Sequence, residues 1–419
     1  MKKTFSIISL GCPRNLVDSE HIAGEFKKKG YVFKDESLGS DTVVINTCSF
    51  IEDAKKESID TILKVIDAKK SGDIKRIIVA GCLSERYQKE LKKELKEVDE
   101  FRGVLDFKST FNDPPERLLT PSYYAYLKIS EGCLNRCTYC IIPYLKGPYK
   151  SKPMDNIIKE AEASIKNGIK EIVLVGQDTS LYGTDMYKKR RLGELLKKLD
   201  SMSDNNWIRL LYCHPKNLDK DTIDIIKDSH HICRYIDLPI EHVSSKILKG
   251  MGRKTTKKDI LSLIDHIRTK IPGSALRTSL IVGFPGETDK DFEELMDFIE
   301  DIRFERLGLF KYSREESTPA YSFKGQVPED IKEERFKEAM ATQQAISKTI
   351  NEGLKGKVLK VLVEEESNGD FIGRTEYDAP EVDGLVYIKS KNKKLNIGKF
   401  YNARIIDTYE YDLVGEVTQ

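Results

Sequence analysis

The sequence predicts an α/β protein of three domains: an N-terminal parallel α/β domain, a central partial (β/α)6 barrel and a C-terminal five-stranded β-barrel. Short apolar runs alternate with amphipathic helical patterns up to about residue 352, which is typical of strands in a parallel sheet. Beyond that point, short strand patterns follow one another without helices. A chain of 419 residues is also too long for one ordinary hydrophobic core.

The first domain, residues 1–112, repeats one strand–helix unit three times. The expected strands are residues 5–10, 42–47 and 76–81, and the expected helices are residues 18–29, 52–68 and 85–96. Cys12, Cys48 and Cys82 each stand just past the end of one of these strands. Because the carboxyl ends of parallel strands share one edge of a sheet, we expect the three cysteines to converge there. The alternative is that they are small core residues placed by chance.

The second domain, residues 121–352, contains six strand–helix units and follows a junction marked by prolines. The expected strands are residues 124–129, 171–175, 207–212, 235–238, 276–282 and 307–312, and the last helix covers residues 332–350. Six units suit a partial, open version of the parallel barrel, whose active site should lie at the carboxyl ends of the strands.

The third domain, residues 353–419, begins at the glycines Gly353 and Gly356. Its expected strands are residues 357–363, 371–375, 385–388, 400–406 and 409–417. Five short strands of this kind predict a small β-barrel like the oligonucleotide-binding fold. The basic run at residues 389–394 is expected to be a hairpin loop, with contact to ribosomal RNA as the alternative.

Composition and charge are those of a cytoplasmic globular protein. The chain is 39% apolar and 33% charged, with a formal net charge of +2. The N-terminus lacks the apolar core of a signal peptide, and no stretch approaches the roughly 18 apolar residues of a membrane span. Cytosolic thiols are kept reduced, so eight cysteines favour metal ligation or catalysis over disulfides. The isolated Cys213 and Cys233 are expected to be small buried residues.

Cys133, Cys137 and Cys140 form a C-x3-C-x2-C motif directly after the first strand of the central domain. A structural zinc site normally has four protein ligands, and no fourth cysteine or histidine is near the motif. Three thiolates suit a 4Fe–4S cluster with one iron left open. An open iron can chelate S-adenosylmethionine (SAM) and pass an electron to it, giving a radical that takes hydrogen from an unactivated carbon. The alternative is a zinc or purely structural site.

The motif resembles the defining motif of the radical SAM superfamily, and two further segments agree with it. Residues 172–178 end the second strand where the superfamily contacts the methionyl amino group, and residues 276–288 resemble its fifth-strand element beside the adenine. The resemblance implies SAM contacts from Tyr139, Gln177, Glu241, Arg277, Ser279 and Ile281. Two positions depart from the pattern. Glu241 stands where glutamine is expected, which puts a ribose contact in question, and Ser317 stands where glycine is usual.

The order of the three domains resembles the methylthiotransferases over almost the whole chain. In that family the C-terminal barrel is called TRAM, and the first domain carries an auxiliary cluster. The resemblance therefore implies two 4Fe–4S clusters, held by Cys133, Cys137 and Cys140 and by Cys12, Cys48 and Cys82. It also implies SAM as methyl donor and radical source, a reductant such as flavodoxin or ferredoxin, a sulfur donor and a monomer. No side chain beyond the cluster ligands is assigned a catalytic role.

Two branches of this family differ in substrate. One modifies the 2-position of an adenosine in transfer RNA, and the other modifies the β-carbon of an aspartate in small-subunit ribosomal protein twelve, free or on the ribosome. Five segments resemble the second branch: residues 9–20, 46–51, 81–87, 137–143 and 378–384. Pro13 stands where transfer-RNA enzymes typically have glutamine. The protein substrate is therefore the main prediction, and transfer RNA is the alternative.

Charge gives a second reason for the protein substrate. The third domain has ten Lys and Arg against twelve Asp and Glu, a net charge of −2, whereas a barrel that binds a phosphate backbone should be basic. Its acidic residues 364–366 and 376–383 would repel RNA and could attract a basic protein loop, and an ordinary solvated surface is the alternative. A non-catalytic RNA-binding factor is the alternative from another class, but it leaves the two sets of three cysteines unexplained.

Overall fold

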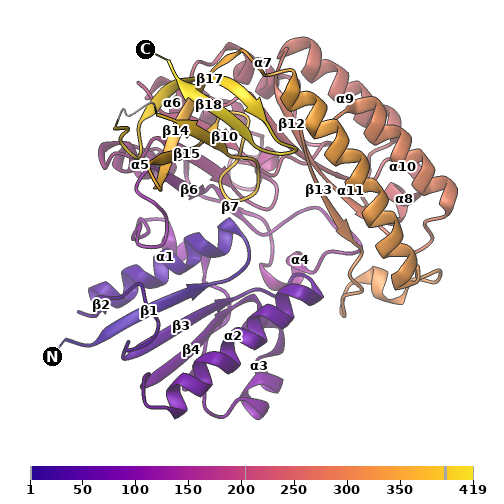
Figure 1. The fold of residues 1–419 in the computed structure, drawn as a ribbon. Helices are drawn as coiled ribbons and strands as arrows, with labels where there is room; N and C mark the ends of the chain where they lie inside the picture. Colours follow the sequence, from indigo (N-terminus) through magenta and orange to yellow (C-terminus); the bar gives the residue numbers. More distant parts are fainter. Residues whose placement is uncertain (1, 203, 391–393, 419) are drawn as a thin grey trace.

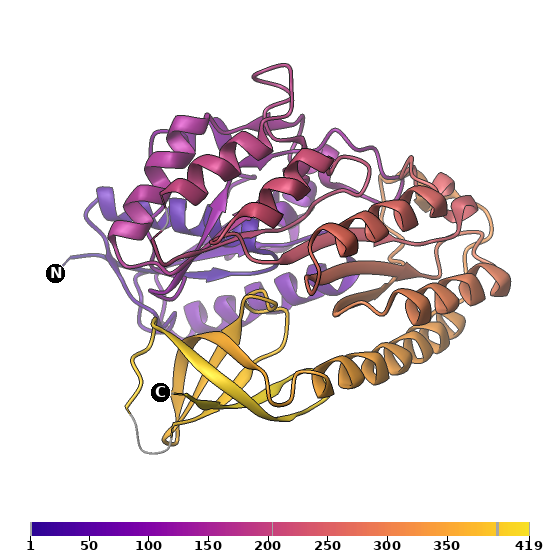
Figure 2. The same cartoon turned by 90° about the horizontal axis from the view of Figure 1, so that it is seen from above.

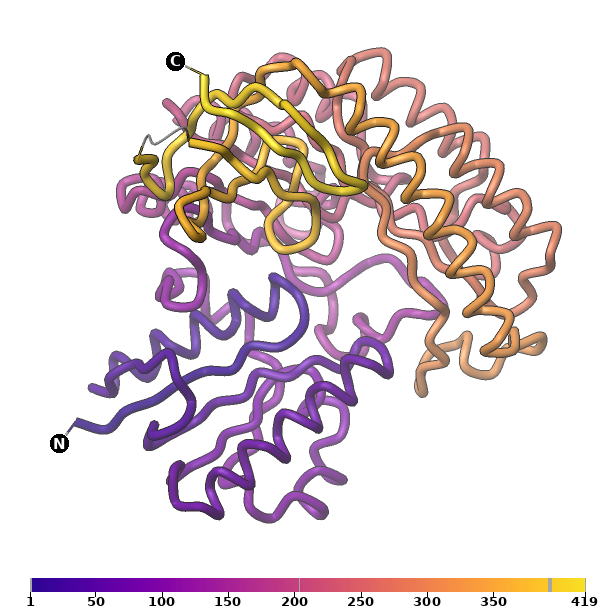
Figure 3. The backbone as a smooth tube through the Cα atoms, viewed as in Figure 1, coloured from indigo at the N-terminus to yellow at the C-terminus, as the bar shows by residue number. Residues whose placement is uncertain are grey.

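The structure is a computed structural model that describes residues 2–202, 204–390 and 394–418. Figure 1 shows three parts in chain order, and the tube in Figure 3 shows the first as a lobe set apart from the other two. The predicted α/β organisation is confirmed, because parallel sheets come first and a closed β-barrel comes last. None of the described helices is both long and apolar enough to cross a membrane.

The N-terminal sheet has five parallel strands in the order β2-β1-β3-β4-β5. The three inner strands agree with the predicted apolar runs, and two-residue strands form the edges: β1 Thr4–Ser9, β3 Thr42–Thr47, β4 Arg76–Gly81, β2 Val32–Phe33 and β5 Glu100–Phe101. The following helices are α1 Pro13–Lys28, α2 Glu52–Lys70 and α3 Cys82–Glu94. Helix α1 begins earlier than its apolar pattern indicated, since proline suits the first turn, where the backbone N–H is unpaired anyway. Cys12 and Cys82 consequently lie at helix N-termini.

Six parallel strands form the central part, in sequence order but in two halves: β6 Tyr124–Lys128, β9 Glu171–Val175 and β10 Trp207–Leu210, then β11 Tyr235–Glu241, β12 Ala275–Val282 and β13 Arg306–Lys311. A single-residue bridge between Ile208 and Ile232 joins the halves. Strand β10 ends at Leu210 instead of residue 212 because Tyr212 has φ 62°, outside the β region. The partial barrel is therefore open at its edges and loosely joined in the middle.

Helices cover the outside of these strands, and Figure 2 shows the last of them leading into the C-terminal barrel. They are α5 Met154–Lys166, α6 Leu192–Ser201, α7 Lys220–Asp228, α9 Lys257–Lys270, α10 Asp289–Ile302 and α11 Glu329–Glu352. Shorter elements lie between them: α4 Ile142–Leu145, α8 Ser245–Gly250, the 3-10 turns η1 Phe107–Thr110, η2 Thr179–Leu181 and η3 Pro319–Ser322, and the paired strands β7 Ser130–Glu131 and β8 Lys150–Ser151. Aliphatic side chains such as Leu174, Leu195 and Leu276 fill the space between strands and helices.

The C-terminal part is a closed barrel with strand order β14-β15-β16-β18-β17. The five predicted strands are present as β14 Val358–Ser367, β15 Asp370–Thr375, β16 Val386–Lys389, β17 Phe400–Thr408 and β18 Leu413–Val417. Asn368 and Gly369 join the first two, and both have positive φ, as a tight hairpin turn requires. Residues 391–393 of the expected basic hairpin loop lie outside the described residues.

Buried charges attach the C-terminal barrel to the central strands. Glu171, at the start of β9, is fully buried and accepts from Arg209 Nε at 2.5 Å and from Arg374 Nη2 at 2.6 Å. Arg209 belongs to β10 and Arg374 to β15, so one carboxylate joins two parts of the chain. Burial alone would raise the pKa of Glu171, but the two guanidinium groups lower it below its usual value. The carboxylate is therefore held ionised.

The acidic segments of the C-terminal barrel mostly face the central part, so most of their carboxylates are not available to attract a basic loop. Asp378 pairs with Arg306 of β13, and Asp383 accepts from the Tyr235 hydroxyl at 2.6 Å. Glu364 is largely buried against the arginine that also binds Glu171. The partners are distant in the sequence, so composition alone could not reveal them. The residues of segment 364–366 that stay exposed are Glu365 and Glu366.

Glu171→Ala should destabilise the protein strongly, because it leaves two buried arginines without this counter-charge. We expect the free energy of unfolding to fall by about 3–5 kcal/mol, measured as lower thermal and denaturant midpoints. Lys355→Ala is the control. It removes one member of an exposed pair with Asp407 and should leave the midpoints close to the wild type. Equal midpoints for the two variants would contradict the role given to Glu171.

Candidate active site between the N-terminal domain and the barrel

The C-x3-C-x2-C loop follows β7 and is fixed by its neighbours, although it has no regular secondary structure. Gly132 has φ 77°, and a Cβ there would lie 2.4 Å from the Pro148 carbonyl oxygen, so only glycine fits before Cys133. Further along the loop, the backbone N–H of Thr138 donates to the Met251 carbonyl at 2.9 Å. The end of α8 therefore holds the loop in place at the carboxyl ends of the strands.

A cavity of about 390 Å³ lies beside this loop. It is bounded by the barrel on one side and by N-terminal residues, among them Phe50 and Ile51, on the other. Its lining includes all three motif cysteines and all six residues implied as SAM contacts: Cys133, Cys137, Cys140, Tyr139, Gln177, Glu241, Arg277, Ser279 and Ile281. The structure thus gathers residues from both halves of the barrel around one space.

Three residues that line this cavity have a buried polar atom without a partner among the described residues: Gln177, Arg253 and Tyr312. Gln177 donates from Nε2 to the Glu131 carboxylate, whereas its Oε1 is buried and unpaired among the described residues. Arg253 Nη1 lies 3.8 Å from Cys137 Sγ, and its Nε is also unpaired within the described chain. A buried polar group without a partner costs about 1–3 kcal/mol. An acceptor and a cationic donor beside one cavity fit a ligand with an ammonium and a carboxylate group, as in the methionyl part of SAM.

Glu241 ends β11 with φ 73°, an uncommon backbone conformation for a residue other than glycine. Burial raises the pKa of its carboxyl group, and Arg253 and the Tyr139 hydroxyl oppose this only in part. A raised pKa favours the neutral carboxyl group, which offers one donor and one acceptor, as the amide of glutamine also does. The replacement of the usual glutamine by Glu241 is therefore chemically conservative in this setting.

The three N-terminal cysteines come together at one edge of the sheet. Gly11 makes this possible: it has φ 89°, and a Cβ there would lie 2.9 Å from Cys48 Sγ. Cys12 is near enough to raise the pKa of Cys48, and Cys12 and Cys48 both help to raise the pKa of Cys82. The convergence expected from the strand ends is present.

The thiols of this set differ in their electrostatic surroundings. Burial alone would raise the pKa of Cys12, but Arg14 and a backbone N–H lower it below its usual value. Burial raises the pKa of Cys82 to about 12. Within the described residues, no three Cys, His, Asp or Glu side chains gather closely enough to hold one metal ion. A 4Fe–4S cluster binds each thiolate through a different iron, so it requires a wider spacing of its cysteines than a single metal ion does.

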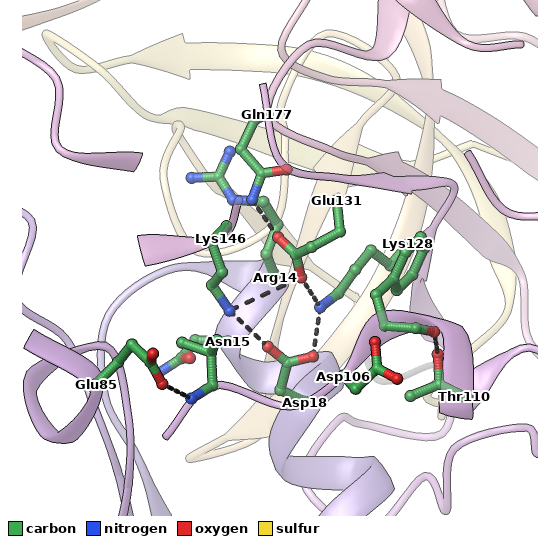
Figure 4. Close-up of polar contacts among 12 residues, drawn as sticks. Arg14, Asn15, Asp18, Glu85, Asp106, Thr110, Lys128, Glu131, Lys146 and Gln177 are labelled. Atoms are coloured by element: carbon green, nitrogen blue, oxygen red, sulfur yellow. Dashed lines mark hydrogen bonds and ion pairs between the residues drawn. The ribbon is translucent and has the colours of Figure 1, made fainter. Parts of the chain in front are cut away.

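A buried ion cluster, drawn in Figure 4, joins helix α1 of the N-terminal domain to the segments on either side of the cysteine motif. Lys146 lies 3.0 Å from Asp18 of α1 and 3.7 Å from Glu131, and Lys128 also pairs with both carboxylates, at 2.7 Å from Glu131. Burial alone would raise the pKa of Glu131, but the two lysines lower it to about 2. Glu131 also accepts from Gln177, so the same carboxylate that ties the domains together orients a residue of the cavity.

Glu315 makes a second contact between the N-terminal domain and the barrel. Its side chain is 1% exposed and pairs with Arg86 at 2.8 Å and Lys55 at 3.1 Å. Nearby, Ser313 accepts from the backbone N–H of Glu52 at 3.3 Å. Ser317, in the same loop, has φ 66°, which explains why glycine is usual there. The loop after β13 therefore closes the N-terminal domain over the cavity.

Sequence reasoning did not find the residues that join the two halves of the site. The structure adds Arg14, Asp18, Lys128, Glu131 and Lys146. Their positions in the sequence could have identified some of them, because Glu131 lies two residues before Cys133 and Arg14 lies two residues after Cys12. Cys213 and Cys233 were predicted to be small buried residues, and each is 1% exposed in a hydrophobic cluster.

Comparison with known proteins gives matches along most of the chain. Residues 4–103 match a family model described as Uncharacterized protein family UPF0004, residues 127–299 match the Radical SAM superfamily, and residues 356–418 match the TRAM domain. Similar curated proteins carry the name ribosomal protein uS12 methylthiotransferase RimO. One from Clostridioides difficile is 46% identical, over 98% of this chain and 97% of its own length. One from Cytophaga hutchinsonii is 45% identical, over 100% and 98%.

Solved structures share the fold at much lower identity. The radical SAM methyltransferase TsrM from Kitasatospora setae aligns with a TM-score of 0.53 at 13% identity, over 76% of this chain and 77% of that one. The cobalamin-dependent SAM radical enzyme OxsB aligns with a TM-score of 0.51 at 13% identity, over 82% and 58%. These likenesses support the fold of the barrel and carry no further conclusion.

Glu315→Ala should loosen the N-terminal domain over the cavity, because Arg86 and Lys55 lose their shared, buried counter-charge. We expect faster amide hydrogen exchange in the two loops that meet there, residues 49–53 and 313–317, while exchange in the inner strands stays slow. Glu333→Ala is the control, since Glu333 forms exposed pairs on α11. Unchanged exchange in both loops of the Glu315 variant would show that this contact does not hold the domains together.

Proposed function

Because the chain belongs to the RimO family of radical SAM methylthiotransferases, we propose that it attaches a methylthio group to the β-carbon of an aspartate in small-subunit ribosomal protein uS12. The chain is a transferase that uses SAM and 4Fe–4S clusters. The observation that carries the proposal is one cavity lined by the three motif cysteines and by Arg14, Phe50 and Ile51, which are close in sequence to Cys12 and Cys48. The names of the relatives favour the protein substrate over transfer RNA.

The two cysteine sets are proposed to hold one 4Fe–4S cluster each. Cys133, Cys137 and Cys140 would hold the cluster that supplies an electron to SAM when bound, and Cys12, Cys48 and Cys82 would hold the auxiliary cluster near the transferred sulfur. In both sets a glycine lets the backbone next to a cysteine approach a neighbouring segment closely. Among the described residues, neither set has a fourth cysteine beside it. Each set therefore leaves one position for a non-protein ligand.

The chain's own side chains would bind and orient SAM. The unpaired Oε1 of Gln177 can accept from the methionyl ammonium, because Glu131 already holds the other end of the amide. Arg253 can donate to the methionyl carboxylate. Glu241, with its raised pKa, can bind a ribose hydroxyl, and Tyr139, Arg277, Ser279 and Ile281 complete the lining. These contacts fix the reactive end of SAM while the closed domain interface excludes water.

Each of the three predicted domains would have a separate role in the reaction. Residues 1–112 would carry the auxiliary cluster, residues 121–352 would bind SAM, and residues 353–419 would contact the substrate. A uS12 substrate, free or on the ribosome, places the reaction in the cytoplasm. The chemistry also requires a reductant, such as flavodoxin or ferredoxin, and a sulfur donor, and we propose that the chain acts as a monomer. Of segment 364–366, the exposed Glu365 and Glu366 are the carboxylates available to a basic partner.

Replacing cysteines should separate the two clusters. Wild type should bind about eight irons, and Cys48→Ala about four, with cleavage of SAM to 5′-deoxyadenosine retained and methylthiolation lost. Cys137→Ala should lose SAM cleavage. Cys233→Ala, from neither set, is the matched control and should keep the full iron content. Methylthiolation by the Cys48 variant would refute the auxiliary site.

Substrate competition tests the proposed function itself. The reconstituted enzyme is offered uS12 and unmodified transfer RNA in one reaction, and both are analysed by mass spectrometry. We expect a gain of about 46 Da on one aspartate of uS12, the mass of a methylthio group replacing hydrogen. Modification of adenosine with no change in uS12 would overturn the proposal in favour of the transfer-RNA alternative.

A further inference from the structure

Among the described residues, the arginine and lysine side chains that line the cavity are Arg14, Arg253, Arg277 and Lys311. Two of them have carboxylate partners: Arg277 Nη1 lies 3.0 Å from Asp237, and Lys311 Nζ lies 3.0 Å from Glu333. Arg253 contacts the Cys137 thiol and the Pro239 carbonyl instead, on the side of the barrel cysteines. That leaves Arg14 on the side of the N-terminal cysteines.

No carboxylate of the described residues lies within ion-pair distance of Arg14. Its Nη1 donates to the Gly176 carbonyl at 2.9 Å, and its guanidinium carbon lies 4.6 Å from the centre of the Tyr212 ring. Figure 4 shows the side chain extending from α1 toward Gln177. The carbonyl and the ring fix the plane of the guanidinium group, and Arg14 also hydrogen-bonds the Cys12 thiol. As a proposed cluster ligand, that thiol shares its charge with iron, and no carboxylate of the described residues balances the arginine. Charged side chains in enclosed sites are normally paired, so the remaining guanidinium donors are available to an anionic ligand.

The place of Arg14 agrees with where the reacting carbon must lie. Arg14 stands beside Cys12 in the chain, and its partner Gly176 directly precedes Gln177. The substrate carbon has to reach both sides, because it loses hydrogen toward the SAM site and gains sulfur from the auxiliary site. In an aspartate, the carboxylate is bonded to that carbon. Gly176 and Cys12 occupy two of the five guanidinium donors, which leaves enough donors for a bidentate contact to a carboxylate.

We propose that Arg14 binds the side-chain carboxylate of the substrate aspartate and makes the enzyme specific for aspartate at the modified position. This inference rests on the proposed function and adds the residue that recognises the substrate. An asparagine in the same place would leave the guanidinium group enclosed without a counter-charge, so the site would discriminate against it. The Tyr212 ring fixes the plane of the guanidinium group, and a carboxylate bound to it would be fixed as well. The β-carbon of the substrate aspartate is bonded to that carboxylate, so its position would also be set.

The test is a double substitution, in the enzyme and in the substrate. The anaerobic holoenzyme with SAM is titrated with uS12, and with uS12 in which the modified aspartate is replaced by asparagine. Wild type should bind the aspartate form at least about tenfold more tightly. Arg14→Gln should bind both forms with equal affinity, and Arg14→Lys, which keeps the charge but loses the planar fork, should show an intermediate preference. Lys311→Gln, which removes a cavity cation that is already paired, should keep the wild-type preference.

Each outcome decides the proposal. A full preference for aspartate in the Arg14→Gln enzyme, or no preference in the wild type, would overturn it. If Arg14 served only the auxiliary site beside Cys12, its variants would lose iron or change the cluster spectrum while keeping the preference, and the proposal would be wrong. If the Arg14→Gln enzyme fails to fold, a preference for aspartate in the Arg14→Lys enzyme that equals the wild-type preference would also overturn the proposal. Failure of the wild type to modify any aspartate of uS12 would instead contradict the proposed function.

Discussion

The buried ion cluster at Glu131 is the interaction on which the site depends. The N-terminal domain and the barrel can enclose one cavity only if the surface between them is fixed, and here that surface contains two carboxylates and two ammonium groups. Asp18 lies on the helix that begins next to Cys12, and Glu131 lies two residues before Cys133. The charges that join the domains therefore also set how the two cysteine sets face each other. Loss of one member would leave an enclosed charge without compensation, which is costly.

Buried ion pairs of the same kind also join the parts of the chain at Glu171 and at Glu315. Glu171 binds arginines from two segments, and Glu315 binds an arginine and a lysine from the N-terminal domain. Buried ion pairs add little net stability compared with apolar packing, but a misplaced domain would leave their charges unpaired. Such contacts accordingly favour one arrangement of the three parts over others. This matters for a reaction in which one carbon must reach two separate groups.

Several polar groups of the cavity, in contrast, lack a hydrogen-bond or ion-pair partner within the part of the chain that the structure describes. Gln177 Oε1 and Arg253 Nε are buried without partners, and Arg14 has no carboxylate among the described residues. Most buried charged groups of the described chain have a partner, so the exceptions that line the cavity mark places where ligands can complete the structure. Two of them lie on the SAM side and one on the auxiliary side. The cavity thus offers separate polar contacts for two ligands.

The sequence by itself determined the features that local pattern controls. Alternating apolar runs and helices predicted the sheets, strand ends placed Cys12, Cys48 and Cys82 at one edge, and the spacing of Cys133, Cys137 and Cys140 indicated an open cluster site. Only the tertiary structure decided which charges face each other. The acidic segment containing Asp378 was expected to meet solvent, yet it pairs with an arginine 72 residues away. The role of Arg14 likewise depends on Gly176, 162 residues along the chain. Periodicity reflects contacts between near neighbours in the chain, whereas the pairing of a buried charge depends on segments that meet only after folding.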